Sequence, residues 1–155
     1  RILDAVEKVN HAQKGVLSRK ICKQLGENLK GRRIALWGLA FKPNTDDLRE
    51  APALAVLEML ESLGAKVRLF DPVAMDHCRM EYPENTVRKY CASAYEAIQG
   101  ADALLLLTEW NEFRRPDFER MRSLMRTPIV FDGRNLFTAE QMTQHGFTYY
   151  SIGRA

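Results

Sequence analysis

The most apolar run in the chain extends from Ala101 to Thr108 and reads Ala-Asp-Ala-Leu-Leu-Leu-Leu-Thr. Its apolar residues do not alternate with polar ones, as they would in a strand with one face in water. Such a run is typical of a strand buried on both faces, at the centre of a parallel sheet that helices cover on both sides. The run therefore predicts an α/β protein with a buried central strand.

Other short apolar runs predict further strands, and helical patterns lie between them. Strands are predicted at residues 34–37, 66–70, 87–90, 127–131 and 147–151, and helices at 53–63, 92–99, 116–125 and 138–145. A strand, a helix and a second strand in succession form a parallel pair with a right-handed crossover. The alternation therefore predicts a Rossmann-like, doubly wound parallel sheet. The polar stretch between residues 71 and 85 is assigned no element.

Residues 1 to about 29 precede this alternation and predict one long N-terminal helix. Its apolar positions recur at steps of three and four residues. They are Ile2, Val6, Val9, Val16, Leu17, Ile21, Leu25 and Leu29. A helix of this length spans roughly 40 Å, more than the remaining domain can cover. Two interpretations stay open: the helix lies across one face of the sheet, or its far end packs on another domain or a second subunit.

Composition excludes several classes of protein. With 155 residues the chain is about one domain, and its net charge of +3 comes from scattered basic residues, not from the stripe expected of a nucleic-acid surface. The sequence has no run of about 18 apolar residues and no signal-peptide core, so it predicts neither a membrane span nor secretion. Because an initiator Met is absent, we expect a fragment of a longer protein.

Cysteine and histidine residues form no recognisable metal motif. The three cysteines are odd in number, the three histidines are dispersed, and neither set has the spacing of a metal site. These residues are Cys22, Cys78, Cys91, His11, His77 and His145. Reduced thiols in a cytoplasmic protein are the simplest interpretation.

A polar loop follows the first predicted strand and leads into a helix. Gly38 permits a sharp exit from the strand, and Pro52 sits in the first helical turn, where proline costs no hydrogen bond. Ligands of open α/β sheets bind at this strand end, and helix N-termini favour anions. Lys42 and Arg49 add positive charge there, so phosphate or another anion is the first ligand to expect. The alternative is that Arg49 pairs with the acidic residues Asp46-Asp47 and only pins the loop.

Two more polar loops follow predicted strands and would meet the first loop at one edge of the sheet. They are Thr108–Asn111 and Asp132–Asn135. Arg134 suits bidentate phosphate binding, although a local pair with Asp132 would account for it equally well. Glu109 and Trp110 would either line a pocket or serve packing.

The second predicted strand ends at Asp71, the position at which a dinucleotide-binding unit holds a ribose hydroxyl. The first loop nevertheless lacks the Gly-x-Gly-x-x-Gly fingerprint, since Gly38 is followed by Leu39, Ala40 and Phe41. Side chains there would block the close approach of a pyrophosphate. We therefore expect that this domain does not carry the main dinucleotide site, which leaves open that Asp71 serves only to end its strand.

Several segments of the chain carry a resemblance to a known family. The chain resembles the C-terminal, UDP-binding domain of the UDP-glucose/GDP-mannose dehydrogenase family at Gly38–Pro52, Thr108–Trp110 and Phe131–Asn135. The first of these reads Gly-Leu-Ala-Phe-Lys-Pro-Asn-Thr-Asp-Asp-Leu-Arg-Glu-Ala-Pro. Val9-Asn10 and Gln13-Lys14 are similar to the end of the family's central helix. Asn44-Thr45 and Thr108–Trp110 are more similar to the UDP-glucose branch than to its relatives.

The resemblance implies an NAD-dependent nucleotide-sugar dehydrogenase. Enzymes of the UDP-glucose branch oxidise UDP-glucose to UDP-glucuronate in two successive hydride transfers to two NAD⁺. Their N-terminal domain binds NAD⁺, and a long central helix connects the domains and forms the core of a homodimer. Residues 1–30 would then be the end of this connecting and dimerisation helix, and residues 31–155 the UDP-sugar-binding domain.

The resemblance also assigns site residues by position. Phe41, Lys42 and Arg134 would contact the UDP-sugar, and Arg49 would reach across the cleft to NAD⁺. The family's catalytic Cys and Lys lie in motifs that this sequence lacks, so no catalytic residue is assigned and the chain alone is expected to be inactive. The alternatives are a GDP-mannose or UDP-N-acetylmannosamine dehydrogenase, or a stand-alone, non-catalytic nucleotide-binding module.

Overall fold

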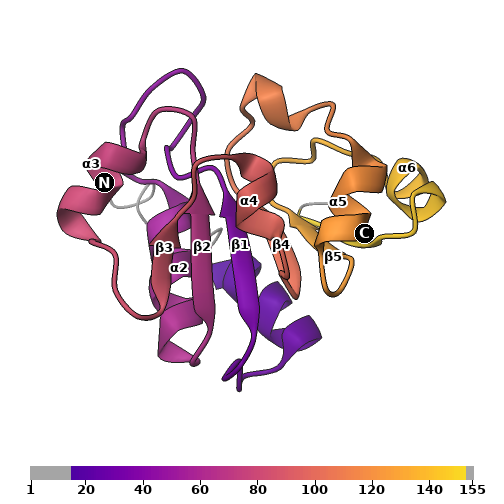
Figure 1. The fold of residues 1–155 in the computed structure, drawn as a ribbon, viewed down its shortest axis with the longest axis horizontal. Coiled ribbons are helices and arrows are strands. Elements are labelled where there is room, and N and C mark those ends of the chain that lie inside the picture. Colours follow the sequence, from indigo (N-terminus) through magenta and orange to yellow (C-terminus); the bar gives the residue numbers. More distant parts are fainter. Residues whose placement is uncertain (1–14, 153–155) are drawn as a thin grey trace, which may run out of the picture.

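The computed structural model describes residues 15–152. This part of the chain forms a six-stranded sheet in the order β3-β2-β1-β4-β5-β6, and neighbouring strands are parallel throughout (Figure 1). The strands are β1 (Arg33–Trp37), β2 (Lys66–Phe70), β3 (Arg88–Tyr90), β4 (Ala103–Leu106), β5 (Ile129–Asp132) and β6 (Thr148–Ser151). This is the strand order of the doubly wound Rossmann fold. From β1 the chain adds strands first on one side, as β2 and β3, and then on the other, as β4 to β6. The predicted Rossmann-like parallel sheet is confirmed.

The most apolar run does form the central strand. β4 lies between β1 and β5, and its four residues are fully buried. The strand is shorter than the run Ala101–Thr108 from which it was predicted, because the residues at both ends of the run pass into loops. Those loop residues are buried as well, which explains why the apolar pattern extends beyond the strand.

Helices cover both faces of the sheet. The helix at residues 15–25, α2 (Pro52–Ser62) and α3 (Met75–Glu81) pack on one face. The other face carries the single 3₁₀ turn η1 (Asn111–Phe113), α4 (Ala94–Ile98), α5 (Phe118–Leu124) and α6 (Ala139–Gln144) (Figure 1). Along β1 the side chains alternate between the two cores, with Leu36 in the first and Trp37 in the second.

Most helix boundaries follow from local chemistry that the sequence shows. Pro52 opens α2, and Gly64 follows its end with a φ of +96°, as predicted. Thr138 caps α6 through its hydroxyl, which accepts a backbone N–H from the first turn. α5 begins after Asp117, which caps it in the same way, and not at Pro116 as predicted.

The sequence pattern did not predict α3. Cys78 is its only buried residue, so the helix lacks the apolar stripe by which helices are recognised. Its Met80 is instead 84% exposed. The helical conformation of α3 therefore depends more on the surrounding structure than on the apolar pattern of its own residues.

Only part of the predicted N-terminal helix lies within the described residues. Residues 15–25 are helical, and the helix ends earlier than predicted because Gly26 adopts a φ of +88°. Leu17 and Ile21 are buried in the core of one sheet face. This part of the helix thus lies across the sheet, which is the first of the two interpretations. Residues 1–14, on which the second depends, lie outside the described residues.

Candidate functional site

The three polar loops meet at one edge of the sheet, beyond the carboxyl ends of β1, β4 and β5. The backbone N–H of Gly133 donates to the carbonyl of Leu106 at 2.8 Å. The buried hydroxyl of Thr108 donates to the carbonyl of Ala40 at 2.6 Å. A Cβ at Gly38 would stand only 2.6 Å from atoms of Thr108, so the close approach of these two loops requires glycine. The predicted convergence of the loops is confirmed.

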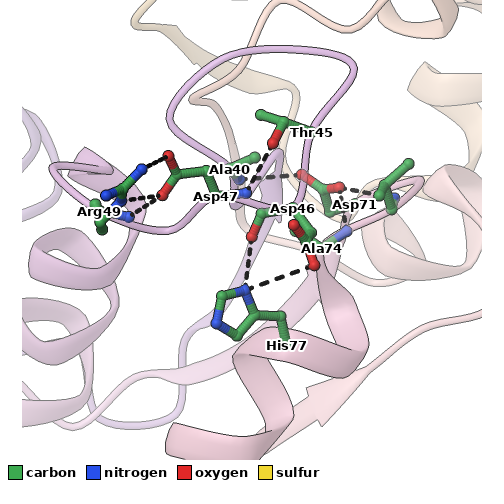
Figure 2. A network of polar contacts seen from close by, with 9 residues as sticks. Ala40, Thr45, Asp46, Asp47, Arg49, Asp71, Ala74 and His77 are labelled. Carbon is green, nitrogen blue, oxygen red and sulfur yellow. Dashed lines mark hydrogen bonds and ion pairs between the residues drawn. The ribbon is translucent and has the colours of Figure 1, made fainter.

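Asp71 follows β2 at the same edge and is fully buried. Its Oδ2 accepts the backbone N–H groups of Leu39 and Ala40 at 2.8 and 3.2 Å. Its Oδ1 accepts those of Val73 and Ala74 at 2.9 and 2.8 Å (Figure 2). Asp71 therefore does more than end its strand, since it fixes the turn that follows β1.

Trp110, in the loop after β4, belongs to the same buried cluster. Its indole Nε1–H donates to Asp71 Oδ2 at 3.0 Å. The side chain is packed inside the protein, so of its two proposed roles the structure supports packing. In the next turn, burial and then the nearby charge of Asp71 raise the pKa of Glu112.

Arg49 and Asp47 hold the loop between β1 and α2 from one side. The guanidinium donates from Nε to Asp47 Oδ1 at 3.0 Å and from Nη2 to Oδ2 at 2.9 Å. These hydrogen bonds from Arg49 lower the pKa of Asp47 to about 2. The alternative in which Arg49 pairs with a neighbouring acid is thus the arrangement observed. Its side chain nevertheless stays 89% exposed and accessible to a ligand.

A contact from α3 holds the other side of this loop. His77 Nδ1 lies 2.8 Å from the carbonyl oxygen of Asp46 and 3.8 Å from its Oδ2 (Figure 2). Asn44 and Glu50 adopt φ values of 67° and 59°, which are uncommon for residues other than glycine. The path of the loop therefore depends on contacts such as that of His77. This role of His77 was not predicted, because the helix that carries His77 was not predicted.

Phe41 and Lys42 form the exposed part of the loop. Phe41 is 43% exposed despite its large apolar ring, while its backbone N–H donates to the carbonyl of Asp47 at 2.9 Å. Lys42 is exposed, and within residues 15–152 it makes no ion pair. An apolar ring next to a free positive charge suits a ligand that combines an apolar or planar group with an anionic one.

Arg134, after β5, pairs with Glu109, after β4. Its Nη2 donates to Glu109 Oε1 at 2.7 Å and its Nε to Oε2 at 3.2 Å. These hydrogen bonds lower the pKa of Glu109. The alternative of a side-chain pair between Arg134 and Asp132 is wrong. Asp132 Oδ1 instead accepts the backbone N–H of Arg134, and Oδ2 accepts Phe137 N–H and the Tyr149 hydroxyl.

All four residues that the sequence assigned to a ligand lie on loops at this one edge. They are Phe41, Lys42, Arg49 and Arg134. The sequence named Glu109 as a pocket residue and missed its pairing with an arginine. Opposite charges on the loops of adjacent strands were the available signal. An incoming anion would meet the unpaired ammonium group of Lys42 and would compete with carboxylates for Arg49 and Arg134.

The turn after β1 does not fit the pyrophosphate of a dinucleotide. The backbone N–H groups of Leu39 and Ala40 would have to bind it, and both already donate to a buried carboxylate. Ala40 also carries a side chain at the second glycine position of the fingerprint, where glycine is required for close approach. The structure therefore agrees with the expectation that the main dinucleotide site lies outside this domain.

No other kind of chemistry is evident in the described part of the chain. Within residues 15–152, no group of three or more His, Cys, Asp or Glu side chains is arranged to hold a metal ion. None of the helices in this range is long and apolar enough to cross a membrane. Burial raises the pKa of the Cys78 and Cys91 thiols, so neither is activated as a nucleophile.

These observations define a Rossmann-like domain with cationic side chains at the ligand-binding edge of its sheet. Residues 35–139 match the UDP binding domain of the UDP-glucose/GDP-mannose dehydrogenase family. The chain belongs to this family, as its three motifs indicated.

Individual relatives agree with this assignment. The UDP-glucose 6-dehydrogenases of Pseudomonas aeruginosa and Rhizobium meliloti are 49% and 42% identical to the chain, each over 99% of its length. The fold is similar to that of a UDP-glucose dehydrogenase from Pyrobaculum islandicum, with a TM-score of 0.78 and 28% identity over 98% of this chain and 32% of that one. The chain spans 35% of the length of the two curated relatives.

Proposed function

We propose that the chain is the UDP-sugar-binding part of an NAD-dependent UDP-glucose 6-dehydrogenase, which converts UDP-glucose and two NAD⁺ into UDP-glucuronate and two NADH. The proposal is carried by the 49% identity with the P. aeruginosa UDP-glucose 6-dehydrogenase, which extends over 99% of the chain. Because the chain corresponds to 35% of that relative, the proposed role is that of one part of a larger enzyme that includes an N-terminal NAD-binding domain.

Phe41, Lys42 and Arg134 are the proposed contacts to the UDP-sugar. The exposed ring of Phe41 offers apolar surface to the base or the sugar, and Lys42 offers an unpaired ammonium group to a phosphate. Arg134 has a planar donor fork that matches phosphate oxygens as well as it matches the carboxylate of Glu109. A diphosphate would therefore take the place of Glu109 on this guanidinium.

Arg49 is the proposed contact to NAD⁺. Its bond to Asp47 holds the guanidinium at the surface of the loop without burying it, so it can reach a cofactor on a facing domain. NAD⁺ would supply the hydride acceptor. The residues of this chain would bind and orient the substrate, and we expect no NADH from UDP-glucose with this chain alone.

A homodimer formed through the N-terminal helix and a cytoplasmic location complete the proposal. In the described part of that helix, Leu17 and Ile21 face the sheet while Val16 is 42% exposed. An apolar side chain on the outer face is compatible with a second contact. Gel filtration of the chain over a range of concentrations tests this, and a monomer at every concentration would refute dimerisation through the helix.

Calorimetric titration of the chain with UDP, UDP-glucose, GDP-mannose and NAD⁺ tests the proposed function. We expect weak binding of the UDP ligands, lost in Arg134→Ala and retained in Arg126→Ala. Arg126 is a matched control because it is exposed and paired with Asp102 at the opposite edge of the sheet. Preference for GDP-mannose would overturn the substrate, and a folded chain that binds no UDP ligand would contradict the site.

A further inference from the structure

We infer that Asp71 is a positioning residue of the proposed UDP-sugar site. Its carboxylate accepts backbone N–H groups that would bind a dinucleotide in this fold. The same carboxylate also accepts the Trp110 indole N–H, so it holds the loops after β1 and β4 together. The inference rests on the proposed function for the identity of the ligand, whereas the hydrogen bonds to Asp71 are present in the chain without a ligand.

The Asp71 carboxylate is saturated with donors. Its Oδ2 accepts Leu39 N–H, Ala40 N–H and the Trp110 indole, and its Oδ1 accepts two further backbone N–H groups of its own loop. The residue is fully buried. A buried carboxylate is tolerated only when hydrogen bonds replace its water, and buried donors are equally costly without their acceptor. The charge and its five donors therefore hold one another in place.

In a dinucleotide-binding Rossmann unit these groups serve a ligand. The turn after the first strand gives its N–H groups to the pyrophosphate, and the acid at the end of the second strand binds the ribose. Here the two halves of that site are bonded to each other, since Leu39 N–H lies 2.8 Å from Asp71 Oδ2. An internal carboxylate has thus replaced the ligand and closed this position to a dinucleotide.

The same carboxylate supports the two loops of the proposed UDP-sugar site that follow β1 and β4. Ala40, one of its donors, directly precedes Phe41 and accepts the Thr108 hydroxyl. Trp110, another donor, directly follows Glu109, the partner of Arg134. Removing the Asp71 carboxylate should therefore loosen the loop after β1 and the loop after β4 at once.

Asp71→Ala removes the acceptor from all five donors, and Asp102→Ala is the matched control. Asp102 is also buried and also accepts a backbone N–H, from Arg33, but it lies at the opposite edge of the sheet. Both variants should lose thermal stability. We expect UDP affinity to fall about tenfold in Asp71→Ala and by less than about twofold in Asp102→Ala. Unchanged UDP affinity in a folded Asp71→Ala chain would overturn the inference.

The two tryptophans provide a readout that needs no ligand. In ¹⁵N NMR spectra, the Trp110 indole N–H reports the bond to Asp71, whereas the Trp37 indole donates to the Ala94 carbonyl and serves as an internal reference. In Asp71→Ala we expect hydrogen exchange at the Trp110 indole to accelerate at least about tenfold more than exchange at Trp37. No selective change at Trp110 would contradict the inference.

Trp110→Phe keeps the inference testable if Asp71→Ala does not fold. This variant keeps the carboxylate and removes the hydrogen bond between Trp110 and Asp71, together with part of the volume of the buried ring. A fall of about threefold or more in UDP affinity supports the inference, and no fall refutes it. If the unmodified chain binds no UDP, the proposed function fails and the NMR exchange rates alone decide the role of Asp71.

Discussion

Replacing Glu109 with glutamine is expected to strengthen UDP binding about fivefold while slightly lowering the stability of the fold. In the ligand-free chain, the Glu109 carboxylate occupies two donor positions of Arg134, at 2.7 and 3.2 Å. A phosphate would need the same two positions. Glutamine keeps the size of the side chain but offers one neutral acceptor, so the arginine is released more easily.

The magnitude follows from the exposure of the pair. The side chains of Arg134 and Glu109 are 33% and 31% exposed, so solvent screens them and the pair resembles a surface salt bridge with good geometry. Such pairs contribute about 1 kcal/mol at most. Removing a competitor of that strength from the unbound chain raises the affinity for UDP about fivefold. The free energy of unfolding should fall by at most about 1 kcal/mol.

The assay is calorimetric titration with UDP at pH 7, where the pair is fully formed. The pKa of Glu109 is lowered in the folded state, so the pair stabilises the fold above the ordinary glutamate pKa and is lost only as pH falls through the lowered value. In the Arg134→Ala background the substitution should leave any residual affinity unchanged. Equal or weaker UDP binding in Glu109→Gln alone would refute competition for the guanidinium.

Three further substitutions test the loop. Because its bond to Arg49 lowers the pKa of Asp47 to about 2, Asp47→Asn should remove a stabilisation that is present above about pH 4 and lost between about pH 4 and 2, as denaturation at several pH values would show. Gly38→Ala should cost about 3 kcal/mol in unfolding free energy, because φ is +100° and a Cβ would stand 2.6 Å from the β4 loop. At Gly26, with φ +88° and no described atom within 4 Å of such a Cβ, alanine should cost only about 1 kcal/mol. Phe41→Ala should weaken UDP binding and leave the melting temperature nearly unchanged, since the ring is 43% exposed; a large drop in melting temperature would show that the ring is needed for packing.

The fold was predictable because its signals are local or repeated. The apolar run 101–108 identified a strand buried on both faces, and the alternation of strands and helices then required parallel pairing. Pro52 and Thr138 marked helix starts through chemistry that acts within a few residues. The convergence of the polar loops followed from the same topology, because parallel strands end at one edge.

The partners of the site residues were not predictable, because they depend on register and on side-chain direction. Glu109 and Arg134 meet because Leu106 lies opposite Asp132 in the ladder of β4 and β5, which brings the next residues of both loops together. Nothing near Asp71 in the sequence shows that its carboxylate turns inward towards three loops. Pattern reasoning identified which residues are charged and where their strands end, but not which charge each one meets.

At three places on this edge, a carboxylate of the chain occupies donors that a bound anion would use, and burial separates them into two kinds. Asp71 is fully buried and accepts five donors, so displacing it would cost far more than displacing an exposed carboxylate. Asp47 and Glu109 are about one-third exposed, and water can replace them on Arg49 and Arg134 as they leave. We therefore expect that Asp71 fixes the loops, and we propose that a ligand takes the place of Asp47 and Glu109. On this proposal the site is positioned before the ligand arrives, and only the ion pairs of Arg49 and Arg134 would change on binding.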